Sequence, residues 1–360
     1  MKYIQEFRDR KQAEILLRHI SAYNGRPVQF MEVCGGHTMA IQKFGIPSVL
    51  PEKVSLVSGP GCPVCVTSQS FVDAAIDLAR RDEVIIATYG DLIRVPGSRS
   101  TLEKEKARGR DIRMVYSTLE ALHLARRNPD RKVVFLGIGF ETTAPATAVA
   151  VQLAHREGLA NFSVLSAHKI MPPAMEALVD EDVQLDGYLA PGHVSTVTGS
   201  GIYHDIAHKH GLPVVVSGFE PVDILQSIHM LLQQIQTGNI RVEIQYSRVV
   251  KPEGNQKAQA VLQQVFELRD DWWRGLGVLP GSGLGLREHY AAHDAERLFG
   301  ITPGAGDTPT GCICGEVLKG VSKPEECALF GTVCDPANPV GTCMVSEEGA
   351  CQAVYRYGRA

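Results

Sequence analysis

Short apolar stretches rich in β-branched residues alternate with amphipathic stretches along most of the chain. After an amphipathic segment that predicts a helix over 8–23, the apolar runs predict strands at 28–33, 54–57, 84–88, 112–116, 133–137, 162–166, 187–190 and 214–217. Helical patterns between them cover 71–81, 117–127, 147–157 and 222–236. Alternation of helices with nearly continuous apolar strands is typical of parallel sheets covered on both faces. The pattern therefore predicts an α/β fold.

The same pattern suggests how the chain divides. It restarts near residue 120, so we expect two doubly wound parallel-sheet domains, at 1–120 and 121–250. Beyond residue 250, a helix is predicted to run as far as Leu268. From residue 301 onward Gly, Pro and Cys dominate and apolar periodicity is lost. A third domain at 251–360 with so little core needs a staple such as a metal or a cluster.

Composition excludes several classes of protein. The 360 residues carry 36 Lys and Arg against 40 Asp and Glu, a net charge of −4, and no basic block. An electrostatic surface for nucleic acid is therefore not expected. No apolar run approaches the ~20 residues that span a membrane, and the beginning of the sequence lacks the apolar segment of a signal peptide. We expect a soluble, cytoplasmic protein that binds neither nucleic acid nor membrane.

Nine cysteines are the unusual part of the composition. An odd number in a long chain without a signal peptide argues against a secreted disulfide framework and favours metal or redox chemistry. Three lie early in the sequence, at Cys34, Cys62 and Cys65. The other six lie near its end: Cys312, Cys314, Cys327, Cys334, Cys343 and Cys351. Two separate thiol sites are the simplest interpretation.

Reactive side chains follow many of the predicted strands. They are Cys34 with His37, Cys62 with Cys65, Glu141, His168, His193 and Glu220. Ligands collect at the carboxyl ends of strands in open parallel sheets, so these residues predict a site assembled from two sheets. Each one alone also has an ordinary interpretation, as a turn histidine, a helix-start carboxylate or a buried thiol. Asp91 and Arg94 could equally form a structural ion pair.

The early cysteines lie in two short motifs. In Cys34-Gly-Gly-His37 the glycines let the backbone approach a bound group, and a following helix N-terminus would lower the thiol pKa. This predicts Cys34 as a soft metal ligand, with His37 as a second ligand or a proton donor. In Cys62-Pro-Val-Cys65 the sulfurs are close enough for a disulfide or for two bonds to a metal. Two unpaired structural thiols are the alternative.

The late cysteines suggest an iron–sulfur cluster. Cys314, Cys327, Cys334 and Cys351 are spaced too widely for a zinc ribbon, whose ligands come in close pairs. Four thiolates in a Gly- and Pro-rich segment fit a [4Fe–4S] cluster. Zinc is the alternative metal, and Cys312 or Cys343 could replace one of the chosen ligands.

Longer motifs around these residues resemble a known family. They are MEVCGGHT at 31–38, GPGCPVC at 59–65, GFETT at 139–143, APGHV at 190–194, GFEP at 218–221, CGEVLKG at 314–320, ECALFG at 326–331, MVS at 344–346 and EGAC at 348–351. In this order they resemble the HypD family of [NiFe]-hydrogenase maturation proteins. The resemblance covers residues 2 to 357.

This resemblance implies a scaffold on which the Fe(CN)2CO group of the hydrogenase is built. A HypC-type chaperone would share the iron, a HypE-type partner charged by a HypF-type carbamoyltransferase would donate cyanide, and the hydrogenase large subunit would receive the product. Cys34 would hold the iron with His37 beside it, and Cys62 and Cys65 would be the redox pair. The cluster ligands would be Cys314, Cys327, Cys334 and Cys351.

Two other classes compete with this one. An iron–sulfur thiol–disulfide oxidoreductase would use the Cys62–Cys65 pair on a protein disulfide. A zinc-stabilised binding protein would have no redox activity. Whether the chain is an enzyme stays open at this point.

Overall fold

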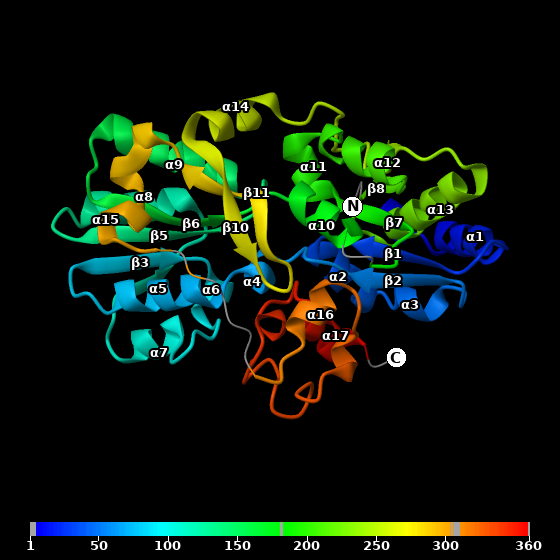
Figure 1. Cartoon of the computed structure of the whole chain (residues 1–360), viewed down its shortest axis with the longest axis horizontal. Helices are drawn as coiled ribbons and strands as arrows, with labels where there is room; N and C mark the ends of the chain where they lie inside the picture. Colours follow the sequence, from blue (N-terminus) through cyan, green and yellow to red (C-terminus); the bar gives the residue numbers. More distant parts are fainter. Residues whose placement is uncertain (1–4, 181–182, 303, 305–309, 359–360) are drawn as a thin grey trace.

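The computed structural model describes residues 5–180, 183–302, 304 and 310–358. Two parallel sheets lie side by side, a two-stranded hairpin crosses between them, and a cysteine-rich unit packs beneath (Figure 1). The α/β class with parallel sheets is therefore confirmed. No helix within these ranges is both long and apolar enough to cross a membrane.

The first sheet has the strand order β2-β1-β7-β8-β9 and is parallel throughout. Its strands are β1 (Val28–Glu32), β2 (Val54–Ser58), β7 (Gly187–Pro191), β8 (Val214–Ser217) and β9 (Val242–Ile244). The helices next to these strands in the chain are α1 (Arg10–Ser21), α2 (Gly35–Lys43), α3 (Ile46–Val49), α11 (Gly192–Thr198), α12 (His204–His210) and α13 (Pro221–Thr237).

The second sheet has the order β4-β3-β5-β6 and is also parallel. Its strands are β3 (Val84–Thr88), β4 (Ile112–Met114), β5 (Lys132–Gly139) and β6 (Phe162–His168). The helices next to these strands in the chain are α5 (Gln69–Ala79), α6 (Gly90–Ile93), α7 (Leu102–Ala107), α8 (Thr118–Arg127), α9 (Ala144–Glu157) and α10 (Pro172–Asp180), of which α10 contacts β7 of the first sheet.

The remaining elements connect the sheets or build the cysteine-rich unit. They are α4 (Pro63–Val66), α14 (Gln256–Val265), β10 (Phe266–Trp273), β11 (Gly277–Leu286), α15 (Ala295–Phe299), α16 (Cys314–Leu318) and α17 (Ala350–Tyr357). Short 3₁₀ helices are η1 (Gln5–Arg8), η2 (Gly201–Tyr203), η3 (Glu288–His293), η4 (Pro324–Glu326) and η5 (Thr342–Met344).

Strand pairing does not follow the expected division near residue 120. β1 pairs with β7, with Phe30 opposite Gly187, and β3 pairs with β5, with Val84 opposite Lys132. Each sheet thus combines strands from both sides of that point, and the prediction of one sheet on each side is wrong. A local hydrophobic pattern shows that a strand exists but carries no information about its partner.

One predicted helix is shorter than expected. The helix expected to reach Leu268 ends at Val265, and Phe266 begins the antiparallel β10–β11 hairpin. In β10 the first and last residues, Phe266 and Trp273, are buried while most residues between them are more exposed. A strand that is buried only at its two ends is expected where a hairpin lies across other elements instead of inside a sheet.

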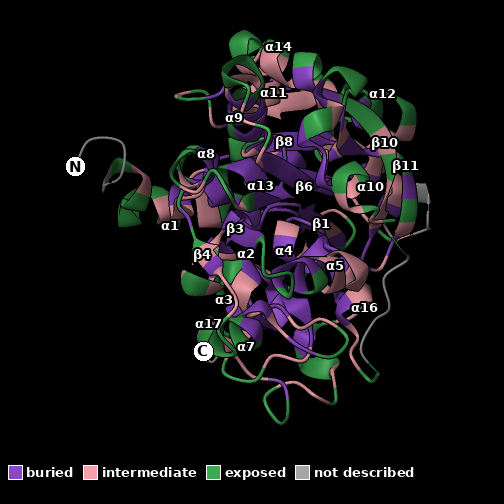
Figure 2. Ribbon diagram, turned by 90° about the vertical axis from the view of Figure 1, so that its left-hand side faces the viewer, coloured by how far each residue is buried: buried purple, intermediate pink, exposed green. Residues whose placement is uncertain are grey.

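Local sequence explains the other elements well. All five residues of β3 are buried, as a strand covered on both faces requires. Helix α13 begins with Pro221, whose missing N–H and fixed φ suit the first turn. It is capped at its C-terminus by Gly238, which has a φ of +67°. Buried residues gather along the strands and helix inner faces (Figure 2). A single apolar cluster includes Val33, Leu136 and Met344, so both sheets and the cysteine-rich unit share one core.

Candidate functional site

Cys34 lies where β1 ends and α2 begins. Its side chain is buried, and burial raises the pKa of its thiol to about 12, with further increases from the nearby Glu348 and Glu32 charges. The backbone amides of His37 and Gly36 oppose this effect but do not reverse it. The expectation that the helix N-terminus lowers the thiol pKa is therefore wrong, because desolvation outweighs the helix.

The two early cysteine motifs pack against each other. The amide of Gly35 donates a hydrogen bond of 3.0 Å to the carbonyl of Gly61. A Cβ atom on Gly61 would lie 2.1 Å from the amide nitrogen of Cys34, so only glycine allows this approach. The loop after β2 is therefore held directly against the Cys34 backbone.

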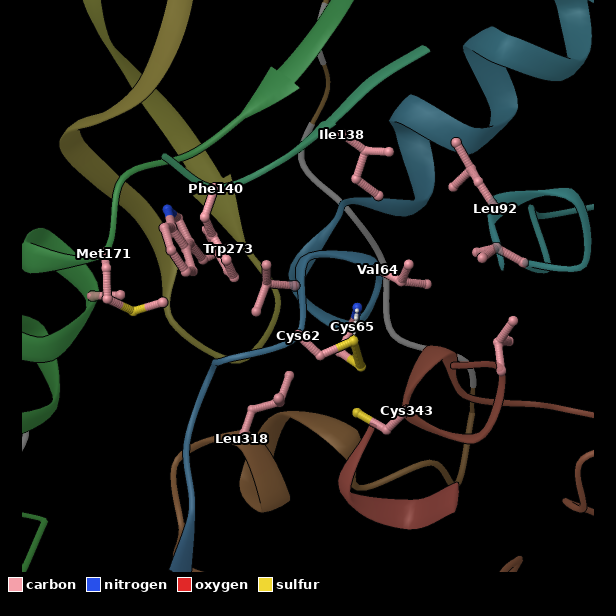
Figure 3. Close-up of a cluster of buried hydrophobic side chains, with 14 of the residues drawn as sticks. Cys62, Val64, Cys65, Leu92, Ile138, Phe140, Met171, Trp273, Leu318 and Cys343 are labelled. Atoms are coloured by element: carbon pink, nitrogen blue, oxygen red, sulfur yellow. Dashed lines mark hydrogen bonds between the residues drawn. A yellow bond between two sulfur atoms is a disulfide. The ribbon is translucent and has the colours of Figure 1, made fainter. Parts of the chain in front are cut away.

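Cys62 and Cys65 form a disulfide across the first turn of α4. Both are buried, with exposed fractions of 3% and 0%. Of the alternatives that the sequence left open, the structure shows the disulfide. Its sulfurs lie beside Cys343 of the cysteine-rich unit, among apolar side chains such as Val64 and Leu318 (Figure 3).

His37 is held in one tautomer. Its Nε2 atom lies 2.9 Å from the carbonyl oxygen of Gly218 and 3.2 Å from that of Ser217. Because two acceptors face it, Nε2 carries the proton and Nδ1 does not. Nδ1 is buried without a hydrogen-bond partner among the described residues, and burial lowers the pKa of His37 to about 4. The ring therefore offers a free lone pair for a proton or a metal.

An aromatic stack brings a second histidine to this place. The rings of His37 and His193 both stack on Phe219, with centroid distances of 4.6 Å and 3.9 Å. Burial lowers the pKa of His193 as well. The carboxyl ends of β1, β7 and β8 thus meet as expected, and Phe219 is a residue of this site that the sequence analysis overlooked.

Two buried carboxyl groups next to Cys34 were also missed. Glu32 accepts hydrogen bonds from the Cys34 amide and the Thr38 hydroxyl, and burial raises its pKa to about 8. Glu348 packs on Gly35, where an added Cβ would lie 2.3 Å from its own Cβ, and burial raises its pKa too. Glu32 is the one charged residue in the predicted strand 28–33, and this was the available signal. Glu348 comes from the far end of the chain, and no local signal connects it with Cys34.

Glu141 approaches from the second sheet. Its Oε1 atom accepts a 2.9 Å hydrogen bond from the Met171 amide, while its buried Oε2 has no partner among the described residues. Burial raises the pKa of Glu141 to about 7. Burial also raises the pKa of Tyr203, with smaller increases from the charges of Glu141 and Cys34. A site assembled from both sheets stays a prediction.

Two other expected residues have structural contacts instead. Glu220 stands at the start of α13 and forms an ion pair with Arg8. His168 is the last residue of β6; its Nε2 lies 3.0 Å from the Thr147 hydroxyl, and its ring packs on Phe266. Within the part of the chain that the structure describes, these contacts join neither side chain to Cys34.

Asp91 and Arg94 do not pair with each other. The carboxylate of Asp91 accepts a 2.7 Å hydrogen bond from Ser346. The Arg94 guanidinium donates to the carbonyls of Val345 and Pro336, at 3.0 Å and 3.2 Å. Both residues therefore fasten the cysteine-rich unit to the second sheet, close to Glu348.

The late cysteines surround one pocket. Its lining includes Cys312, Cys314, Cys327, Cys334 and Cys351. The sulfurs of Cys312 and Cys314 are 3.2 Å apart. The Cys314 sulfur also interacts with those of Cys343 and Cys351. All four expected ligands are present, and both alternative ligands lie beside them.

The donor set around this pocket is of the kind that binds an iron–sulfur cluster. Within the described residues, no three His, Cys, Asp or Glu side chains are grouped so that they could hold one metal ion. A cluster is instead bound by one thiolate at each of several corners, so its ligands surround a volume. Several cysteines around an otherwise apolar pocket, with Leu329 and Phe330, fit that requirement.

Comparison with known proteins gives this arrangement a family. The profile of HypD, described as "Hydrogenase formation hypA family", matches residues 11–358. The chain belongs to the HypD family. It is 50% identical to the "Hydrogenase maturation factor HypD" of Rhizobium leguminosarum bv. viciae, over all of this chain and 96% of that protein. It is 49% identical to the proteins of the same name from Azotobacter vinelandii and Rhodobacter capsulatus, over all of this chain and 97% and 99% of theirs. The resemblance inferred from the motifs is thus confirmed.

Proposed function

We propose that this HypD-family chain is a hydrogenase maturation factor that holds iron at Cys34 while the Fe(CN)2CO group is assembled. The observation that carries this proposal is the position of Cys34, buried between the disulfide loop at Gly61 and the cysteine-rich unit at Glu348. A soft thiolate suits electron-rich iron that bears cyanide and CO. The iron is cargo, received here and passed on.

The residues around Cys34 would prepare this place for iron. Burial excludes water, and the Cys34 thiol must lose its proton when iron binds. The unprotonated Nδ1 of His37 is the proton acceptor that supports this proposal. His193 and Phe219 hold the His37 ring in place.

We also propose a [4Fe–4S] cluster in the cysteine-lined pocket. Its ligands would be Cys314, Cys327, Cys334 and Cys351, with Cys312 or Cys343 as a replacement. Such a cluster exchanges single electrons, whereas a dithiol–disulfide couple exchanges two. The Cys62–Cys65 pair follows the Gly61 loop that packs on Cys34 and lies beside Cys343 of the cysteine-rich unit, which suits a supply of electrons to the iron.

The partners follow from the family alone. We propose a HypC-type chaperone that shares the iron, a HypE-type cyanide donor and, indirectly, the hydrogenase large subunit.

The experiment that tests this function is maturation of a [NiFe]-hydrogenase in cells that lack their own HypD. We expect wild type and the exposed-site control Val321→Ala to restore hydrogenase activity. Cys34→Ala and the double variant Cys62→Ala/Cys65→Ala should not restore it, although the double variant should keep the visible absorbance of the cluster. Normal maturation with Cys34→Ala would contradict the proposal.

An iron–sulfur thiol–disulfide oxidoreductase is the second candidate, since the disulfide lies next to the cysteine-lined pocket. Its burial argues against this function, because a protein disulfide could not reach Cys65 at 0% exposure. Turnover of a protein disulfide with reduced ferredoxin would favour the oxidoreductase, whereas a scaffold shows none.

A further inference from the structure

Arg274 is a buried cation without a carboxylate partner. It lies in the turn between β10 and β11, and its exposed fraction is 2%. Lys169, which is as deeply buried, pairs with Asp271, and the half-buried Arg248 pairs with Asp223. No ion pair to Arg274 exists within the described part of the chain. A buried charge is costly unless something compensates it, so the surroundings of this guanidinium need an explanation.

The guanidinium holds the turn that carries the disulfide. Its Nε donates to the carbonyl of Cys65 at 3.1 Å and its Nη2 to that of Thr67 at 3.0 Å. The backbone amide of Arg274 donates to the carbonyl of Val66 at 3.1 Å. Three successive carbonyls at the end of α4 are therefore satisfied by one residue. Carbonyl dipoles compensate part of the charge, but they carry no net negative charge.

The same turn also contacts the cysteine-lined pocket. Gly275 packs on the backbone of Gly315, so closely that an added Cβ would lie 2.7 Å from the Gly315 carbonyl oxygen. Gly315 directly follows Cys314. Arg274 and Gly275 thus belong to one turn that contacts both the end of α4, which carries the disulfide, and the cysteine-lined pocket.

We propose that Arg274 is a positioning residue whose positive charge favours the reduced, more negative forms of the Cys62–Cys65 pair and of the cysteine-lined pocket. Anionic sulfur is the missing counter-charge for this buried guanidinium. The inference about the pocket rests on the proposed function, whereas the inference about the disulfide does not. Reduction of the disulfide breaks one S–S bond with two electrons from a dithiol, which itself closes to a disulfide. One proton of that dithiol goes to one protein sulfur and the other to solvent, so that the second protein sulfur stays a thiolate.

The test is the redox equilibrium of the Cys62–Cys65 pair in the protein purified without oxygen. Wild type, Arg274→Gln, Arg274→Lys and two controls are equilibrated with set ratios of reduced and oxidised dithiothreitol, alkylated and analysed by peptide mass spectrometry. The control Thr342→Val removes another hydrogen bond to the Cys65 carbonyl, which is 3.0 Å long, without a change of charge. The control Arg126→Gln removes an exposed charge that pairs with Glu157.

We expect Arg274→Gln to lower the equilibrium constant for reduction about tenfold, a shift of ~30 mV toward negative potential. Arg274→Lys and both controls should stay within about threefold of wild type, because they keep the buried charge. An unchanged constant in Arg274→Gln, or a tenfold loss in Arg274→Lys, would overturn the proposal. If the glutamine variant does not fold, a tenfold loss in Arg274→Lys still overturns the proposal.

A second measurement separates this inference from the proposed function. The midpoint potential of the cluster, followed by EPR, should also become more negative in Arg274→Gln. If wild type contains no cluster, the proposed cluster is refuted. The redox equilibrium of the disulfide then remains the test of the role of Arg274. A cluster whose potential does not move would overturn the role of Arg274 at the pocket and leave the function intact.

Discussion

His37 is the residue whose chemistry is fixed most clearly by its contacts. Two carbonyls, of Ser217 and Gly218, hold the proton on Nε2. The ring therefore presents Nδ1 as a lone pair, and burial keeps the imidazole neutral at physiological pH. A neutral, oriented imidazole can bind a metal or accept a proton without first losing one.

The substitution His37→Gln separates the two ring nitrogens. A glutamine amide can still donate to the Gly218 carbonyl, but it has no equivalent of Nδ1. We expect His37→Gln to fold with a thermal midpoint close to that of wild type and to lose at least about tenfold in hydrogenase maturation, the scale of a lost general base or metal-positioning group. Full maturation with this variant would show that Nδ1 is not used.

Glu141 should make the stability of the protein depend on pH. The folded state raises its pKa from 4.5 to about 7, so the folded protein binds this proton more tightly than the unfolded chain does. The stabilisation is complete below pH 4.5 and is lost as the pH rises through 7, with a slope of up to about 1.4 kcal/mol per pH unit.

The variant Glu141→Gln tests this dependence and keeps an acceptor for the Met171 amide. Urea unfolding at several pH values between 5 and 8.5 should show wild type losing stability as the pH rises, and the variant losing less. Parallel curves for the two proteins would mean that Glu141 is not protonated in the folded state.

At the scale of elements, the site depends on strand ends that approach one another through glycine. Gly61 lies against Cys34 with no room for a side chain, and Gly35 lies in the same way against Glu348. Loops after β1 and β2 and the tail before α17 thus meet at one point. Their close backbone packing, more than any single side chain, fixes where Cys34 lies.

Gly61→Ala should therefore disturb Cys34 as well as stability. We expect a loss of about 1–3 kcal/mol in the free energy of unfolding, the usual cost of overpacking a tight site. Gly201→Ala is the matched control, because an added Cβ there meets no atom within 4 Å. Reaction of Cys34 with a small alkylating agent should become faster in Gly61→Ala only. Equal stability in the two variants would contradict the close approach.

Prediction from sequence succeeded where the information is local. The apolar runs marked β1 to β8 with nearly correct ends, and turn motifs after β1, β2 and β7 pointed to the site. It failed for β10, because Phe266 continues an apparent helical pattern. It also failed for strand partners, which depend on segments far apart in the chain.

The candidate site was predictable to a similar extent. Cys34, His37 and the cysteine pair could be named because their motifs are unusual. The raised pKa of the Cys34 thiol could not be predicted, because it comes from burial and from Glu348 at the far end of the chain. Arg274 gave no signal, because a single arginine in a turn is ordinary until its burial is known.

At the scale of the whole molecule, the cysteine-rich unit packs beneath both sheets (Figure 1). It contacts α2 through α17 and α4 through η5, and it is fastened to the second sheet by Asp91 and Arg94. Cys34, the disulfide and the cysteine-lined pocket therefore belong to one packed body. Loosening of the cysteine-rich unit should therefore move the pocket away from Cys34 and from the disulfide.

Arg94→Ala tests how firmly this unit is held. Loss of the hydrogen bonds to Pro336 and Val345 should increase amide hydrogen exchange over 324–358 several-fold, with little change in β3 and β5. Arg110→Ala is the control, because Arg110 pairs with the exposed Asp82 on the same sheet. Equal exchange over 324–358 in both variants would show that Arg94 does not fasten the unit.

In the proposed function, Cys34 holds the iron that carries cyanide and CO. Its most direct test is the infrared spectrum of the protein purified without oxygen from cells that also produce the chaperone and the cyanide donor. We expect cyanide and CO stretching bands in wild type and in Gly201→Ala, and none in Cys34→Ala. The same bands at full intensity in Cys34→Ala would contradict the account, because the iron would then be held elsewhere.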